Sequence, residues 1–214
     1  MFDWVTFANL ATAIGTTLLA VATFAATRSA NRSARSAERA LLENIRPILL
    51  PSNWSDPVQK VRFMDGRWVM VPGGRAAVEL SDDSAYVVLS LRNAGRGLAV
   101  LHGWSIPDNP RAQPAAPSDF FRLTRDIYVP TTDPGFCQIA ERDPQSDFYV
   151  RIREHLTTTD SLPVDVLYGD AEGTQRIISR FFLSRGPSEH ADEGNEYALT
   201  VSRHWNLDLP SPRT

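Results

Sequence analysis

Few residues in this chain of 214 have the types and spacing that catalysis requires. The single cysteine, Cys137, has no histidine at a fixed spacing, and the four histidines show no metal-ligand interval such as i and i+4. The segment Asn93-Ala-Gly-Arg-Gly is only superficially similar to a phosphate-binding loop, because we expect a strand after it rather than a helix. The sequence therefore predicts no metal, no cofactor and no enzymatic activity.

One group of residues has a composition suited to binding an anion. Between positions 148 and 153, Phe148, Val150 and Ile152 alternate with three polar or basic residues, which predicts a strand of period two. The polar face of that strand would carry Tyr149, Arg151 and Arg153. Such a face could bind a carboxylate or a phosphate, and an exposed sheet face without function has the same composition.

The N-terminal segment predicts a transmembrane helix. Residues 4–27 carry no charge, and a helix of that length is roughly 36 Å long against roughly 30 Å of hydrocarbon. A run of this length is difficult to bury in a small domain, which argues against a core helix. A cleaved signal peptide also fits poorly, because no basic side chain precedes the apolar run.

Residues 28–44 are expected to continue this helix as a basic amphipathic juxtamembrane segment, because they include no Gly or Pro. Two stripes run along it on opposite sides, each repeating at steps of 4, 3 and 4. The basic stripe is Arg28, Arg32, Arg35 and Arg39, and the small apolar stripe is Ala30, Ala34, Ala37 and Leu41. The basic stripe either only fixes the orientation of the span or also contacts anionic lipid. The small stripe could pack against a second copy, giving a homo-oligomer, or against another membrane protein.

The distribution of charge predicts the orientation of the span in the cell membrane. The arginines follow the span and no Lys or Arg precedes it, so the positive-inside rule places residues 1–3 outside and the C-terminal part in the cytoplasm. A lone cysteine that cannot form an intrachain disulfide agrees with a reducing compartment.

Residues 45–207 are predicted to form an antiparallel β domain, and we expect an immunoglobulin-like β-sandwich. Two hairpins are signalled by Asp65-Gly66 and by Gly169-Asp-Ala-Glu-Gly, and residues 107–117 are too rich in proline for a central strand. The strands are expected at 46–50, 61–64, 67–71, 76–80, 86–92, 98–104, 148–153, 164–168, 176–183 and 197–203. Residues 208–214 form a loose tail. After residue 44 the chain has 18 basic and 22 acidic residues, which argues against nucleic acid as a partner.

Several short motifs together resemble a family. Arg46-Pro47, Leu91-Arg-Asn-Ala-Gly-Arg-Gly-Leu-Ala, Val166-Leu-Tyr-Gly-Asp-Ala-Glu-Gly and His204-Trp-Asn-Leu-Asp are similar to segments of uncharacterised small bacterial membrane proteins of actinobacterial type. That resemblance implies a single-pass protein with a tethered β-sandwich, and it implies no activity.

The sequence favours a non-enzymatic function. The first hypothesis is an interaction or scaffold module that is tethered at the cytoplasmic face of the membrane and binds a protein partner. The alternative is a membrane-anchored sensor of a small anionic ligand or lipid headgroup.

Overall fold

The computed structural model describes residues 4–159, 161–185 and 195–209, and the chain divides into two compact units, Met1–Asn44 and Ile45–Thr214. The external terminus expected at 1–3 lies outside the described residues, as does the part of the expected tail from 210 to 214.

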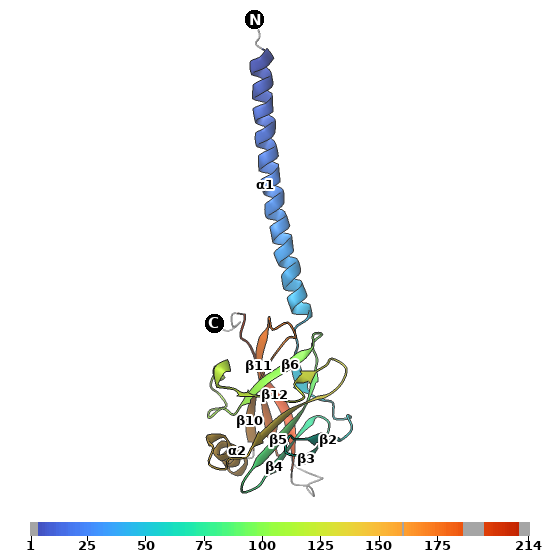
Figure 1. The fold of residues 1–214 in the computed structure, drawn as a ribbon, viewed down its shortest axis with the longest axis vertical. Coiled ribbons are helices and arrows are strands. Elements are labelled where there is room, and N and C mark those ends of the chain that lie inside the picture. The colour runs from blue at the N-terminus through green and yellow to red at the C-terminus, as the bar shows by residue number, and fades with distance from the viewer. Residues whose placement is uncertain (1–3, 160, 186–194, 210–214) are drawn as a thin grey trace. The chain divides into compact units, whose positions relative to one another are not determined.

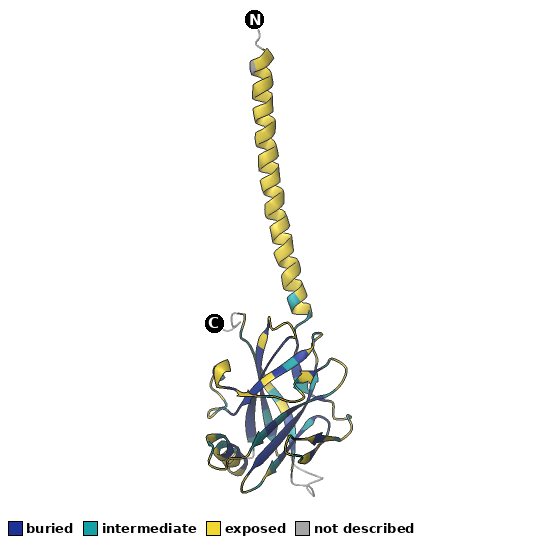
Figure 2. Cartoon of the chain, viewed as in Figure 1, coloured by how far each residue is buried: buried dark blue, intermediate teal, exposed yellow. Residues whose placement is uncertain are grey.

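The first unit contains one uninterrupted helix, α1 (Trp4–Asn44), of 41 residues (Figure 1). It joins the predicted span and the predicted juxtamembrane segment without a break. Its residues are exposed along nearly the whole length, whereas dark buried residues fill the centre of the β domain (Figure 2). The prediction of a long N-terminal helix is confirmed.

The second unit is an antiparallel β domain. The strands are β1 (Leu49–Pro51), β2 (Gln59–Arg62), β3 (Trp68–Val71), β4 (Arg75–Leu80), β5 (Ala85–Asn93), β6 (Ala99–Ser105), β7 (Phe121–Arg122), β8 (Tyr128–Val129), β9 (Gly135–Glu141), β10 (Ser161–Gly169), β11 (Arg176–Ser184) and β12 (Glu196–Asn206). A 3-10 turn, η1 (Pro117–Asp119), precedes β7, and helix α2 (Asp147–Thr158) precedes β10.

Ten of these strands form one sheet in the order β1-β5-β4-β12-β11-β10-β6-β7, with β8 on β6 and β9 on β5. The sheet curves around one main core, because residues from strands distant in this order, such as Leu89 of β5 and Val164 of β10, belong to the same buried cluster. The Tyr168 hydroxyl also accepts a hydrogen bond from the backbone N–H of Leu49, 3.3 Å away, which ties β10 to β1. An antiparallel β domain is thus confirmed, and the immunoglobulin-like arrangement stays a prediction.

Both predicted hairpins form. β2 and β3 pair in a separate two-stranded sheet, and Gly66 in its turn has a φ of 89°, a left-handed conformation that glycine adopts without strain. β10 and β11 pair along their full length, from Ser161 opposite Ser184 to Gly169 opposite Arg176. The turn residues, together with the apolar runs beside them, were therefore sufficient to find these hairpins.

The strand predicted at 148–153 is wrong, because these residues lie in helix α2. The Ser146 hydroxyl caps this helix by accepting a hydrogen bond from the backbone N–H of Tyr149. The side chains buried on it, Tyr149, Ile152 and Leu156, follow the i, i+3, i+7 spacing of a helix face. A strand was instead missed at β9, where Gly135, Cys137 and Ile139 alternate as buried positions.

Candidate functional site

The first 24 residues of α1 have the properties of a membrane span. This segment belongs to the one described helix that is long and apolar enough to cross a bilayer, and none of the apolar window is buried by the protein. Leu18, Leu19 and Phe24 are each about two-thirds exposed. A core helix of a soluble protein would bury such side chains, so their exposure argues against a core helix and is compatible with a membrane span.

Five threonine hydroxyls of this segment are paired with the backbone of the helix. The hydroxyls of Thr12, Thr16, Thr17, Thr23 and Thr27 each donate to the carbonyl four residues earlier, at 2.8 to 2.9 Å. These bonds reduce the cost of placing a hydroxyl in hydrocarbon.

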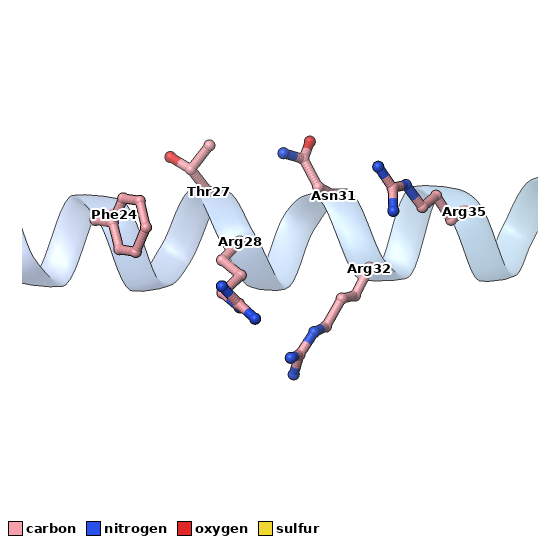
Figure 3. Close-up of a pocket in the computed structure, with 6 residues that line it drawn as sticks. All are labelled: Phe24, Thr27, Arg28, Asn31, Arg32 and Arg35. Atoms are coloured by element: carbon pink, nitrogen blue, oxygen red, sulfur yellow. The ribbon is translucent and has the colours of Figure 1, made fainter.

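The basic stripe forms a run of unpaired cations. Among the described residues, no carboxylate forms an ion pair with any of its members, Arg28, Arg32, Arg35 and Arg39. Figure 3 shows the guanidinium groups of Arg28 and Arg32 extending from one edge of the helix, with Thr27 and Asn31 on the opposite edge. The hollow between these side chains is open and is lined by one helix alone, so it is not a ligand cavity. What the stripe offers is a row of charges available to phosphate groups.

The small apolar stripe is also without a partner. Its members, Ala30, Ala34, Ala37 and Leu41, are exposed, and in the span a Cβ added at Gly15 would meet no atom within 4 Å. A second helix could approach this side closely.

The two glycine-containing motifs lie at the point where the chain enters the β domain. A Cβ added at Gly97 would stand 1.8 Å from the carbonyl oxygen of Ile45, and one at Gly95 would stand 2.1 Å from that of Arg46. The loop 93–97 is therefore packed directly against the entry segment 45–48. The motif that is superficially similar to a phosphate loop instead holds the entry segment in place.

Buried polar side chains fix this entry segment. The Asn93 side-chain oxygen accepts hydrogen bonds from the backbone N–H groups of Ile48 and Gly95, at 3.1 and 3.0 Å. Just after the other motif, the Gln175 side chain accepts a hydrogen bond from Arg46 Nε at 2.9 Å. We call Arg46, Asn93, Gly95, Gly97 and Gln175 the entry collar.

Asp170 shapes the second motif. Its carboxylate accepts hydrogen bonds from the backbone N–H groups of Thr174 and Gln175, at 2.7 and 3.1 Å. Burial alone would raise the pKa of Asp170, but bonds from the Thr174 hydroxyl and from these two backbone groups outweigh burial and lower it. The carboxylate thus stays ionised and holds the turn that carries Gln175.

The predicted anion-binding face does not exist as a shared face. Successive positions two apart on α2 point to nearly opposite sides. Tyr149 is buried, with its hydroxyl donating to the carbonyl of Ser81, and Arg153 is exposed. Arg151 pairs with Asp108 at 2.8 Å. The three side chains therefore do not form the sheet face that was predicted, and the sensor hypothesis itself stays a prediction.

A buried ion pair that the sequence analysis missed lies on the outer face of the sheet. Arg180 contacts both carboxylate oxygens of Asp165, at 2.6 and 2.7 Å, and both side chains are almost fully buried. Its remaining nitrogen donates to the carbonyls of Pro110 and Ala112, at 2.6 and 2.9 Å. Burial raises the pKa of Asp165, and the bond and charge of Arg180 oppose that rise. The pair fastens the proline-rich loop onto β10 and β11.

This pair was accessible to sequence reasoning through the hairpin. In the β10–β11 register, Asp165 and Arg180 are directly opposite each other. Opposite charges at facing positions attract, so a register assigned from the turn would have joined them.

Two side chains capable of nucleophilic chemistry, Cys137 and Ser179, are fully buried. Burial raises the pKa of the Cys137 thiol to about 12, so it stays protonated. The Ser179 hydroxyl lies 2.6 Å from Nδ1 of His204, but Ser179 is fully buried and its hydroxyl also bonds Tyr168 at 2.9 Å. Burial lowers the pKa of His204. In the described part of the chain, no three His, Cys, Asp or Glu side chains are grouped to hold a metal ion.

Comparison of the chain with protein-family models, curated proteins and solved structures finds no match.

Proposed function

We propose that this protein is a membrane-tethered, non-enzymatic interaction or scaffold module. Its N-terminal helix spans the cell membrane once and its β domain binds a protein partner in the cytoplasm. The observation that carries the proposal is the exposed, uncharged first part of α1, which is followed directly by four arginines that form no ion pair with a described residue. A helix of this composition is stable when lipid surrounds it.

The two stripes give the second part of α1 two different binding sides. The basic stripe holds the helix at the inner surface, where each arginine near anionic lipid contributes about 1 kcal/mol. The small apolar stripe permits a second copy or another membrane helix to pack closely. We further propose that the curved sheet is an immunoglobulin-like sandwich and that the chain is kin to the small actinobacterial membrane proteins it resembles.

Tethering suits an interaction module because it raises the local concentration of the β domain for partners in the same membrane. The entry collar supports this role, since it fixes the segment through which the β domain is attached.

The test is extraction of membranes from cells that produce the full chain. Alkaline carbonate should leave the protein in the pellet, and detergent should release it together with a partner in fixed stoichiometry. A variant lacking residues 4–27 should appear in the soluble fraction. Release of the intact chain by carbonate would contradict the proposal.

A further inference from the structure

We infer that the exposed face of the β2–β3 hairpin is a docking surface for an acidic, extended segment of the protein partner. The inference rests on the proposed function and specifies the surface it uses. The docking surface consists of Lys60, Arg62, Met64, Trp68 and Met70.

The hairpin is anchored on one side, which leaves the other side available. Val61, Val69 and Val71 are buried against β4 and β5, in a cluster that includes Tyr86 and Val88. The alternate positions point outward, as the pleat of a strand requires. A rigid hairpin thus presents a fixed outer face.

That outer face has the composition of a binding site. Trp68 is 47% exposed, Met70 54% and Met64 74%. Tryptophan is enriched among the residues that dominate binding energy, and methionine adapts its shape to a partner. A surface that served only solvation would rarely gather three large apolar side chains on one short hairpin.

The cations on this face have no carboxylate partner among the described residues. Lys60 Nζ lies 5.0 Å from the centroid of the Trp68 ring, and Arg62 Cζ lies 5.7 Å from it. The neighbouring Arg67 differs, because it pairs with Glu79 at 2.7 Å. In a β domain that is acidic as a whole, the docking surface is therefore a local cationic site that attracts carboxylates.

The backbone of β2 adds a second recognition element. The N–H of Phe63 donates to the carbonyl of Arg67 at 2.8 Å. Hydrogen-bonded pairs alternate along an antiparallel ladder, so the backbone groups of Lys60 and Arg62 point away from β3. In the described residues β2 pairs with β3 alone, which leaves this edge open to an added strand.

The unpaired edge of β2 and the cations Lys60 and Arg62 favour the same kind of ligand. A segment added beside β2 would place alternate side chains on the outer face, opposite Lys60 and Arg62. Carboxylates two residues apart would then meet both cations. The partner chemistry is an extended run with Glu or Asp at alternate positions, which favours a protein segment over a lipid surface.

The experiment uses the full chain in nanodiscs of uncharged lipid and a fluorescent peptide of alternating Glu and Val. We expect saturable binding that weakens by at least about tenfold in K60E/R62E and in W68A. The matched control R153E reverses an exposed arginine of α2 and should bind as the wild type does. A peptide with Lys in place of Glu should bind K60E/R62E better than it binds the wild type.

Equal affinity of K60E/R62E and wild type for the glutamate peptide would overturn the inference, as would the absence of saturable binding to the wild type. Binding of the wild type to anionic vesicles through the same residues, without peptide binding, would assign the surface to lipid and overturn it too. In each case retention in carbonate-washed membranes with a co-purifying partner would leave the proposed function standing. Thermal unfolding of each variant verifies that the hairpin remains folded.

Discussion

Asp65 in the turn of the β2–β3 hairpin has a strongly perturbed carboxyl group. A hydrogen bond from the Tyr86 hydroxyl, one from the backbone N–H of Arg67 and one from the Arg142 guanidinium lower its pKa from 3.8 to about 2. The folded state thus favours the ionised carboxylate. Its contribution to stability is fully present above the unfolded value of 3.8 and is lost as the pH falls toward 2.

We therefore predict that the protein loses stability in this acid range and that D65N reduces this dependence, because the Asp170 carboxyl, whose pKa is also lowered, continues to contribute. The measurement is the midpoint of thermal unfolding of the full chain in detergent, recorded between about pH 5 and 2 for the wild type and for D65N. Y86F, which deletes the first of the three hydrogen bonds, should retain only part of the dependence. Identical pH profiles for wild type and D65N would contradict this assignment.

The Arg180–Asp165 pair predicts a large effect of a single substitution. R180M leaves the Asp165 carboxylate buried without its partner, which costs about 3–5 kcal/mol of unfolding free energy. The double variant R180M/D165L removes both charges and should recover much of that loss. Denaturant titration measures the unfolding free energies of the single and the double variant.

The exposed pair Arg176–Asp208 is the comparison for this prediction. R176M should change the unfolding free energy by at most about 1 kcal/mol, because solvent screens that pair. If R180M and R176M have similar effects, the proline-rich loop is not fastened as described.

The sequence predicted the positions of individual side chains best where all of them lie on one helix. The stripe from Arg28 to Arg39 needs no tertiary information, since helical periodicity alone places its members on one side. The group at Tyr149, Arg151 and Arg153 failed because alternation over six residues fits a strand and overlooks a cap at Ser146.

Among the elements, the entry collar depends on glycine at two positions. G97A would force a methyl group toward the Ile45 carbonyl, a contact of 1.8 Å that the backbone must relieve by moving. We expect a loss of about 1–3 kcal/mol in the unfolding free energy. A94S alters an exposed side chain of the same loop and should have little effect. Comparable stability of G97A and A94S would contradict the close packing of this loop.

Strand pairs were predicted from the sequence when a short connection joins the two strands, and were not predicted when the strands are far apart in the chain. Hairpins with short turns, β2–β3 and β10–β11, were found because both strands and the turn are local in sequence. The pairing of β12 with β4 joins Glu196 to Ala77 across more than half the chain, and no local pattern encodes it. The two-residue strands β7 and β8 are too short to show a period.

For the whole molecule, we expect the four arginines after the proposed span to determine which compartment holds the β domain. We predict that replacing Arg28, Arg32, Arg35 and Arg39 by Gln weakens this preference and yields molecules in both orientations. Protease accessibility of the β domain in sealed inverted vesicles measures the two populations. A single unchanged orientation would show that the arginines do not set it.

The orientation itself is read from reporters fused after Thr214. The account predicts that a green fluorescent protein at this position is fluorescent and that an alkaline phosphatase, which requires the oxidising periplasm, is inactive. An active phosphatase with a dark fluorescent protein would place the β domain outside the cytoplasm and contradict the account.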